Sequence, residues 1–346
     1  MKHQTTRYGE VPFYKIGTFG NTADAFISKK LFLEYKTKYS FPKKGDILIS
    51  ASGTIGRAVI YDGKPAYFQD SNIVWIDNDE TLVKNDFLFY AYSNVKWNTE
   101  HTTILRLYND NFRNTLIPLP PLNEQIAIAN ILSDLDRYLC ALDALILKKE
   151  GVKKSLSFEL LSQRKRLKGF NQSWQRVRLG DIANYLISNL SAEQITQQGK
   201  IKVYDVNNFI GYTDTTFISD KPYISIVKDG SVGRVRILPP KTNILSTMGA
   251  LIANHRTTTE FLFYLLSNFD FKNFISGSII PHIYFKDYKE KTIFLPPLNE
   301  QNAIANILST LDNEITSLKN KKRQFENIKK TLNHNLMSAK IRVLKK

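Results

Sequence analysis

The sequence predicts a mixed α/β protein with two similar globular domains and two long helices packed as an antiparallel coiled coil. Three observations lead to this prediction. An eighteen-residue string occurs twice, a heptad pattern of apolar residues follows each copy, and short β-rich runs precede each copy in the same order. The chain of 346 residues is long enough for two or three domains, each with its own core.

The repeated string reads LPPLNEQIAIANILSDLD at 119–136 and LPPLNEQNAIANILSTLD at 295–312. Only two positions differ between the copies, which lie 176 residues apart. Each copy predicts a helix start, because a proline lacks the N–H that the first turn would leave unpaired, and an Asn-Glu pair suits the positive end of the helix dipole. A gene duplication that kept the helices and let the domains diverge explains this arrangement.

Apolar residues follow each string at alternating steps of three and four, which is the heptad pattern of a coiled coil. The predicted seam consists of Ile128, Leu132, Leu135, Leu139, Leu142 and Ile146 in the first helix, and of Ile304, Leu308, Leu311, Ile315, Leu318 and Phe325 in the second. Each helix can run for about 40 residues, or roughly 60 Å. A helix of that length with one apolar stripe needs a partner, so we expect the two helices to pack as an antiparallel or crossed pair.

A β-rich segment precedes each helix. The first contains GDILIS, RAVIYDG and NIVWIDND before the helical pattern NDFLFYAYSNVKW, and the second contains PYISIV and GRVRILPP before TTTEFLFYLLSNF. We therefore expect a first domain at 1–117, a helical spacer at 118–168, a second domain at 169–293 and a second helical spacer at 294–346.

The formal net charge of +16 favours a polyanionic partner, nucleic acid before a membrane surface. Residues 137–168 contain nine Lys/Arg and three Asp/Glu, and residues 313–346 contain ten and two, so these stretches carry +14 of the +16. The rest of the chain is close to neutral, so nucleic-acid reading by it would depend on particular side chains. Two solvated helix faces explain the basic stretches equally well.

The common catalytic motifs are absent from the sequence. It contains neither of the common glycine-rich phosphate loops, its five histidines are scattered, and no Cys/His spacing suits a metal. The Pro-Pro pairs are flanked by leucine, whereas an adenine-methylating site needs a polar residue before and an aromatic residue after them to grip a flipped base. We therefore expect a chain that is not an enzyme and has no metal site.

The single cysteine, Cys140, excludes an internal disulfide, and its leucine-rich surroundings predict a small buried or seam residue. No apolar run approaches the roughly 20 residues of a membrane helix, and the N-terminal sequence lacks the apolar stretch of a signal peptide. These features predict a cytoplasmic protein with no membrane partner.

A Gly-x-x-Gly-Arg turn occurs in each domain directly after a hydrophobic run, as GTIGR at 53–57 and as GSVGR at 230–234. Such a turn lets backbone amides approach a phosphate, and its arginine can fork onto guanine or bridge phosphates. A plain hairpin turn that needs glycine for positive φ is the alternative, and the recurrence leaves the two interpretations balanced.

The candidate DNA-contacting residues group around these turns. The first domain contributes Lys43, Lys44, Ser50, Ser52, Gly53, Thr54, Arg57, Gln69, Asp70, Arg106 and Tyr108. The second contributes Lys228, Ser231, Arg234, His282 and Tyr284, the last two aligned with Arg106 and Tyr108. Gln69 and Asp70 belong to a polar cluster that could read adenine edges, although an ordinary polar loop explains it equally well.

Over essentially the whole chain these features resemble the specificity subunit of Type I restriction-modification systems. The resemblance is carried by the duplicated LPPLNEQ string before each long helix, by FPKKGDILISASGTIGRAVIYDG and AYFQDSNIVWID in the first domain, and by WQRVRLGDIANY at the start of the second. The duplicated string is a specific signal, whereas the turn motif alone is a weak one.

The resemblance implies two target-recognition domains that each read one half of a bipartite site in double-stranded DNA, with the helices as a molecular ruler. It also implies two modification subunits docked on the helices and the start of each repeat, for which the candidates are Asn123, Glu124, Gln125, Asn299, Glu300 and Gln301. Two identical partners related by approximate twofold symmetry require two near-identical docking surfaces, which explains the duplicated string.

The same resemblance implies that this chain holds no cofactor. S-adenosylmethionine would be bound by the modification subunits, and ATP and Mg²⁺ by restriction subunits, two of which the family allows. The alternative is a non-catalytic basic coiled-coil scaffold that binds nucleic acid without sequence specificity.

The first domain departs from the pattern of the second at its N-terminal end. Trp174 and the run RVRLGDIA precede Tyr204 by about thirty residues, but Tyr14, the counterpart of Tyr204, lies only fourteen residues from the start. The first domain is therefore expected to lack the opening strand and turn. A truncation, a recombined allele, or a shorter domain completed by the C-terminal tail of the other repeat each explains this.

Overall fold

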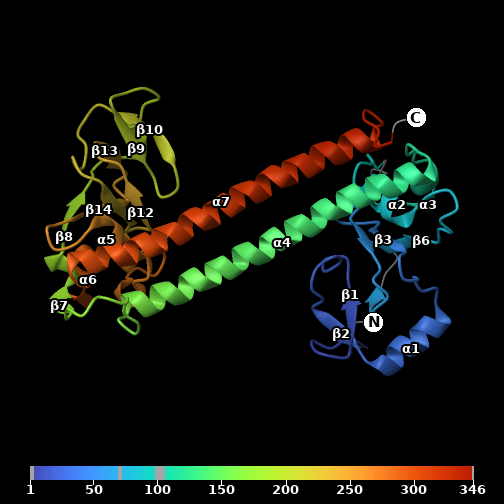
Figure 1. Cartoon of the computed structure of the whole chain (residues 1–346), viewed down its shortest axis with the longest axis horizontal. Helices are drawn as coiled ribbons and strands as arrows, with labels where there is room; N and C mark the ends of the chain where they lie inside the picture. The colour runs from blue at the N-terminus through green and yellow to red at the C-terminus, as the bar shows by residue number, and fades with distance from the viewer. Residues whose placement is uncertain (1–3, 69–71, 98–105, 345–346) are drawn as a thin grey trace. The chain divides into compact units, whose positions relative to one another are not determined.

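The computed structural model describes residues 4–68, 72–97 and 106–344. The chain divides into two compact units, one made of the described residues up to Asp143 together with those from Asn320 onward, the other of Ala144–Lys319. Two helices of 40 residues each, α4 (Leu122–Leu161) and α7 (Leu298–Met337), contribute to both units (Figure 1). None of the helices in the described part of the chain combines the length and the apolar character that crossing a membrane requires.

The first unit contains two small sheets. In one sheet β1 is central, antiparallel to β2 and parallel to β5, and in the other β3 is central and antiparallel to both β4 and β6. The strands are β1 (Val11–Tyr14), β2 (Ala25–Ile27), β3 (Ile47–Ser50), β4 (Ala58–Ile60), β5 (Tyr67–Phe68) and β6 (Ile73–Ile76). The short helices are α1 (Lys29–Lys38), α2 (Asn85–Tyr92) and α3 (Asn109–Arg113).

Strand β3 is buried along its whole length because both of its faces are covered. Ile47 and Ile49 pack against Leu88 of α2, whereas Leu48 packs against Phe19 on the other face. This is why the strand sequence ILIS is continuously apolar up to its final serine rather than alternating. The arrangement fixes the end of β3, where the Gly-x-x-Gly-Arg turn begins.

The second unit contains three sheets, with strand orders β10-β9-β13, β12-β11-β14-β8 and β15-β7. The strands are β7 (Gln175–Arg178), β8 (Ala183–Ile187), β9 (Ile201–Tyr204), β10 (Phe209–Thr213), β11 (Tyr223–Val227), β12 (Val235–Leu238), β13 (Thr242–Ile244), β14 (Met248–Ala253) and β15 (Thr292–Leu295). The helices are α5 (Thr259–Ser267), α6 (Phe285–Tyr288) and the single-turn 3-10 helices η2 (Leu179–Asp181), η3 (Ala192–Gln194) and η4 (Lys272–Phe274).

The two units repeat one order of elements. Strands β1, β2 and β5 correspond to β9, β10 and β13, strands β3, β4 and β6 correspond to β11, β12 and β14, and α2 corresponds to α5. Within the described residues of the first unit nothing corresponds to β7, η2 or β8, so its second sheet has three strands where the other has four.

Helices α4 and α7 begin directly after the Pro-Pro pairs, as the repeated string predicts. Asn123 lies inside the first turn of α4, where its side chain accepts a hydrogen bond from the N–H of Glu124, and Asn299 does the same for Glu300 in α7. Each string therefore folds in the same way at its own helix start.

The predicted seam and the antiparallel order are confirmed within each unit. In the first unit Ile128 and Leu132, near the start of α4, pack with Leu336 and Met337 at the end of α7. In the second unit Ile304 and Leu308, near the start of α7, belong to the same core as Leu160 at the end of α4. All twelve predicted seam residues are buried or half-buried.

Cys140 is exposed, so the prediction that it is a buried or seam residue is wrong. It follows the seam residue Leu139 by one position, and one step along a helix turns the side chain by about 100°. The surrounding leucines belong partly to the seam and partly to the outer surface, where Leu145 and Leu147 are exposed.

Candidate nucleic-acid interface and helix junctions

Each Gly-x-x-Gly-Arg turn links two antiparallel strands, β3 to β4 in the first unit and β11 to β12 in the second. The second glycine has a positive φ in both turns, 80° at Gly56 and 81° at Gly233. A Cβ at Gly56 would lie 2.2 Å from Nε1 of Trp97, and one at Gly233 would lie 2.7 Å from Cδ2 of Phe271. Both conformation and space therefore require glycine, as the hairpin interpretation predicts.

The backbone amides of these turns are engaged inside the fold. The N–H groups of Gly56 and Gly233 donate to the carbonyls of Ser50 and Val227, both at 2.9 Å, and the N–H of Gly230 donates to the carbonyl of Pro281. The expectation that the turn presents its amides to a phosphate is therefore wrong for these three glycines. A nucleic-acid contact by Gly53 stays a prediction.

Ser50 was predicted to contact DNA, and the structure contradicts this. Its side chain is only 1% exposed. The hydroxyl donates to the carbonyl of Thr54 and accepts from the N–H of Arg57. Ser50 therefore closes the turn from inside, which a serine at the end of a fully buried strand can do because its hydroxyl both donates and accepts.

The arginine of each turn is held by a loop of its own unit, the loop between β1 and β2 in the first unit and the loop between β9 and β10 in the second. The Arg57 guanidinium donates from Nη1 to the carbonyl of Phe19 at 2.9 Å, and that of Arg234 donates from Nη2 to Oδ1 of Asn207 at 2.7 Å. Arg57 is half-buried, whereas Arg234 is exposed. A guanidinium has five N–H donors, so each arginine keeps donors for a further acceptor.

A second chain segment runs beside each turn and brings the remaining candidates to it. Ser52 forms an isolated β-bridge with Arg106, and Asp229, which follows Lys228, forms the equivalent bridge with His282. The predicted alignment of Arg106 with His282 is therefore confirmed in position. Two surfaces result: Ser52, Gly53, Thr54, Arg57, Arg106 and Tyr108 in the first unit, and Lys228, Ser231, Arg234, His282 and Tyr284 in the second.

The other candidates do not join these surfaces. Lys43 and Lys44 precede β3, whereas the turn follows it, so the four-residue strand separates them by roughly 13 Å. Lys43 instead pairs with Asp77 at 3.3 Å on the exposed surface. Gln69 and Asp70 lie outside the described residues.

Sequence reasoning missed several side chains of the second surface. Asp229 Oδ1 lies 2.7 Å from His282 Nδ1, and Arg236 donates from Nη1 to the carbonyl of Asn207 and lies over the ring of Tyr204 at 5.3 Å. Arg236 is the second residue of β12, two positions after Arg234, and this spacing places both on the same face of the hairpin. The two-residue spacing of Arg234 and Arg236 in the sequence could have predicted that Arg236 lies beside Arg234.

The Gln residues of the LNEQ strings join each domain to the start of its helix. Gln125 accepts a hydrogen bond from the N–H of Lys84 at 2.8 Å and donates to the carbonyls of Leu82 and Pro120. Gln301 accepts from the N–H of Thr258 at 3.0 Å and donates to the carbonyls of Arg256 and Pro296. Both side chains are fully buried, and Lys84 and Thr258 are the N-caps of α2 and α5.

The Glu residues of the LNEQ strings are also buried and pair with residues of this chain. Glu124 pairs with Arg342, which holds the pKa of that carboxyl below its ordinary value through hydrogen bonding to the guanidinium. Glu300 pairs with Arg166 at 2.6 Å and also accepts from Nε1 of Trp174 at 2.9 Å. Of the six predicted partner-binding residues, only Asn123 and Asn299 are exposed. Docking of partners at the string stays a prediction for these two, and the Glu and Gln side chains act inside the chain.

A Tyr-Asp-Lys cluster occurs once in each unit. In the first, the Tyr90 hydroxyl donates to Asp136 at 2.8 Å and Lys329 forms an ion pair with the same carboxylate. In the second, the Tyr264 hydroxyl donates to Asp312 at 2.9 Å and Lys153 takes the place of Lys329. Burial and the neighbouring carboxylate raise the pKa of both tyrosines, so both hydroxyls stay protonated donors.

Many lysines of α4 and α7 form ion pairs with carboxylates of the other helix. Besides these clusters, Lys149 pairs with Glu314, Lys319 with Glu150, and Lys322 with Asp143. The picture of two freely solvated basic faces is therefore incomplete, because several of these lysines face a carboxylate of the other helix. Among the residues that the structure describes, no three His, Cys, Asp or Glu side chains gather as a metal site would need.

Comparison with known proteins places the chain in a family. The family model for the Type I restriction modification DNA specificity domain matches residues 1–150 and again residues 171–327. A Haemophilus influenzae protein named "Putative type I restriction enzyme specificity subunit S.HindORF215P" is 64% identical over 133 residues, which cover 38% of this chain and 34% of that protein. The Methanocaldococcus jannaschii type I restriction enzyme MjaVIII specificity subunit is 25% identical over 362 residues, covering 92% of this chain and 84% of the relative.

Solved structures share the fold. The S subunit of the Type I restriction-modification system from M. genitalium matches with a TM-score of 0.66 and 20% identity, over 97% of this chain and 91% of that one. A chain from a structural study of complex assembly in the type I R-M system matches with a TM-score of 0.52 and 17% identity, over 86% of this chain and 81% of that one. The family model thus matches the chain twice, and each match contains one of the two repeated units with its own Gly-x-x-Gly-Arg turn. The chain belongs to the Type I restriction modification DNA specificity domain family.

Proposed function

We propose that this chain is the DNA-recognition subunit of a Type I restriction-modification complex, in which each unit reads one half of a bipartite duplex site. The observation that supports this most strongly is the pair of turn surfaces, alike in backbone and different in side chains. Arg106 and His282 occupy the same position, as do Ser52 and Asp229. Equivalent scaffolds with different side chains suit two readers of different half-sites.

The helices act as the spacer between the readers and as the platform for partners. The proposed partners are two modification subunits, which would hold S-adenosylmethionine and methylate adenine, and, in complexes that also cleave DNA, two restriction subunits that use ATP and Mg²⁺. This chain contributes recognition and no catalytic group, and it acts in the cytoplasm. The equal helix starts at Leu122 and Leu298 support the idea of two equivalent docking positions.

The competing idea is a basic scaffold without sequence specificity. It depends on free cations along the helices, and the interhelical ion pairs of Lys149, Lys153, Lys319, Lys322 and Lys329 reduce their number. A competition experiment separates the two ideas. The chain assembled with its modification subunits is bound to a labelled duplex that carries the bipartite site, at moderate salt, and is challenged with unlabelled site, shuffled duplex or heparin. Recognition predicts that the site competes far better than the shuffled duplex, whereas equal competition by all three would favour the scaffold.

A further inference from the structure

Two arginines lie side by side on the second unit, and one residue accepts a hydrogen bond from each. Arg234 ends the Gly-x-x-Gly-Arg turn and Arg236 is the second residue of β12, so their side chains share a face and start about 7 Å apart. Arg234 donates from Nη2 to Oδ1 of Asn207 at 2.7 Å, and Arg236 donates from Nη1 to the carbonyl of Asn207 at 2.9 Å. Like charges this close repel each other, so the shared acceptor residue is what holds them together.

The turn between β9 and β10 fixes Asn207 in this position. The carboxylate of Asp205 accepts from the N–H of Asn207 at 2.7 Å and from the N–H of Asn208 at 2.6 Å. The N–H of Asp205 in turn donates to the carbonyl of Asn208 at 3.0 Å. An aspartate that binds the backbone two residues further on is a common way to close a tight turn. Asn207 therefore presents both of its oxygens to the arginines from an ordered backbone.

Arg236 is also held from a second side, by an aromatic ring. Its guanidinium carbon lies 5.3 Å from the centre of the ring of Tyr204, the last residue of β9, which is a favourable position for a planar cation. Its other two side-chain nitrogens have no hydrogen-bond partner among the described residues and are not buried, so an external acceptor can reach them. The groups that hold Arg234 and Arg236 are neutral, so both arginines keep their full charge for a ligand.

The first unit has an apolar cluster at the corresponding place. The strand pairing aligns Val59 with Arg236, because Val59 lies opposite Leu48 as Arg236 lies opposite Ser225. Val59 and Leu48 belong to one hydrophobic cluster. Of the two arginines, the first unit therefore keeps only the one in the turn, Arg57.

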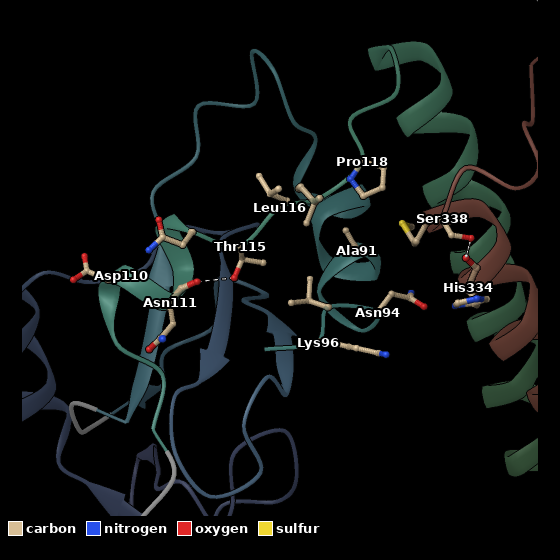
Figure 2. Close-up of a pocket in the computed structure, with 14 residues that line it drawn as sticks. Ala91, Asn94, Lys96, Asp110, Asn111, Thr115, Leu116, Pro118, His334 and Ser338 are labelled. Atoms are coloured by element: carbon tan, nitrogen blue, oxygen red, sulfur yellow. Dashed lines mark hydrogen bonds between the residues drawn. The ribbon is translucent and has the colours of Figure 1, made fainter. Parts of the chain in front are cut away.

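The cavity of the first unit that Figure 2 shows adds no cationic site to that unit. It has a volume of about 650 Å³ and is lined by α2, α3, the segment 114–118 and the end of α7. Among the described residues that line it, the fully charged ones are Lys96 and Asp110, whose charges are opposite. The lining includes no residue of the Gly-x-x-Gly-Arg turn. The paired cations are thus a feature of the second unit.

We propose that Arg236 is a further DNA-contacting residue of the second unit, and that Asn207 is a positioning residue that fixes Arg234 and Arg236 as one pair. This rests on the DNA-recognition function proposed above. Arg234, exposed at the end of the turn, reads a base edge, and Arg236, half-buried and further along the strand, binds a backbone phosphate. A guanidinium can fork onto either acceptor.

The two hydrogen bonds of Asn207 make the two roles separable, because Arg234 uses its side chain and Arg236 its backbone. Asn207→Ala removes Oδ1 and keeps the carbonyl, so it releases Arg234 and leaves Arg236 in place. The preference for the correct base in one half-site should fall about fivefold or more, whereas the salt dependence of binding should stay unchanged.

Arg236→Ala should give the opposite result. Loss of a phosphate contact lowers the slope of the logarithm of the binding constant against the logarithm of salt concentration by about one. Affinity should fall by the same factor for the recognised duplex and for a shuffled one, because a phosphate contact carries no sequence information. Arg236→Lys keeps a positive charge and should retain the wild-type slope.

The test uses the full chain assembled with its modification subunits and labelled duplexes, with fluorescence anisotropy at several salt concentrations. The duplexes carry the motif found by methylome sequencing, the same motif with each position changed in turn, or a shuffled sequence. Asn208→Ala is the matched control for Asn207, because the turn uses only the backbone of Asn208. Arg176→Ala removes an exposed arginine of β7, in another sheet of the same unit, and is the control for Arg236. Both controls should bind like the wild type.

An unchanged salt slope in Arg236→Ala would overturn the phosphate contact. An unchanged base preference in Asn207→Ala, or a loss of slope and preference together, would overturn the positioning role. If the wild-type complex preferred no bipartite duplex, the proposed function would fail and this inference with it. If the wild type showed the preference and both variants matched their controls, the inference alone would be wrong.

Discussion

Lys329 of α7 forms an ion pair with Asp136 of α4. The same contact recurs between Lys153, which lies 176 positions before Lys329, and Asp312, which lies 176 positions after Asp136. The first half of each helix thus meets the last half of the other. Two copies of one helix sequence packed antiparallel give each copy the same neighbours, which explains why both copies keep the same charged residues. Tyr90 and Tyr264 attach the domains to these carboxylates.

The coupling between Lys329 and Asp136 should be measurable. Both side chains are about a quarter to two-fifths exposed, and Tyr90 shares the carboxylate, so a double-mutant cycle of Lys329→Met and Asp136→Asn should give about 1 kcal/mol. Urea unfolding provides the free energies. The control cycle uses Lys15 and Asp24, a pair more than half solvent-exposed on average, where the coupling should be close to zero. Equal coupling in both cycles would contradict the structural role of the cluster.

Gln125 should be far more costly to replace than its polar appearance suggests. Gln125→Leu leaves the N–H of Lys84 and the carbonyls of Leu82 and Pro120 without this partner at a partly buried junction, and an unpaired group that water cannot reach costs about 1–3 kcal/mol. We expect a loss of about 2–4 kcal/mol in the unfolding free energy, and a similar loss for Gln301→Leu. Asn130→Ala, on the exposed face of α4, is the control and should stay within about 0.5 kcal/mol of the wild type. If Gln125→Leu left the unfolding free energy unchanged, the hydrogen bonds of Gln125 would not stabilise the junction between the first domain and α4.

Gly56→Ala tests the hairpin interpretation of the turn. Positive φ costs an L-residue about 1–2 kcal/mol, and the added methyl group would overlap the ring of Trp97, so we expect a total of about 2–4 kcal/mol in thermal or urea unfolding. Gly17→Ala is the control because its φ is not positive and nothing lies within 4 Å of the added carbon. If both variants were equally stable, the steric argument would be wrong.

The pair of Glu124 and Arg342 makes the first unit sensitive to acid. The pKa of Glu124 in the folded chain lies below its ordinary value of 4.5, so its contribution is complete above that value and disappears as pH falls through the folded pKa. Urea midpoints of the wild type should therefore fall toward those of Glu124→Gln as the pH is lowered below about 4.5. Arg342→Met removes the cause of the shift and should show the same flattened pH dependence. A constant difference between wild type and Glu124→Gln at all pH values would contradict the assignment.

Arg234→Ala and Arg57→Ala should each weaken one half-site only. A lost bidentate base contact costs about 1–3 kcal/mol, which appears in methylation profiles as relaxed sequence preference in that half. Arg234 is the sharper test, because it is exposed and its replacement disturbs only one hydrogen bond, to Asn207. Tyr39→Ala, an exposed residue after α1, provides the control. The assignment of these arginines to the DNA interface would be wrong if either change relaxed the sequence preference at both half-sites. It would also be wrong if neither change relaxed the preference at any half-site.

Periodicity allowed the helices, their seam and their antiparallel order to be predicted, because a heptad pattern reports directly on burial. The shared order of elements in the two domains could also be predicted, because the Gly-x-x-Gly-Arg turn occurs at the same place in both. The roles of Gln125 and Glu124 could not be predicted, since their partners Lys84 and Arg342 are 41 and 218 residues away along the chain. Ser50 was misread for a similar reason: a serine beside glycines looks like an exposed donor until the burial of the whole strand is known.

The most direct test of the central claim is single-molecule methylome sequencing of cells that carry this chain with its modification subunit, compared with cells that carry the modification subunit alone. Recognition of a bipartite site by two units predicts N6-methyladenine in one motif made of two short specific halves and a fixed nonspecific spacer, and only when this chain is present. Methylation of a single uninterrupted motif, or no motif that depends on this chain, would contradict the account.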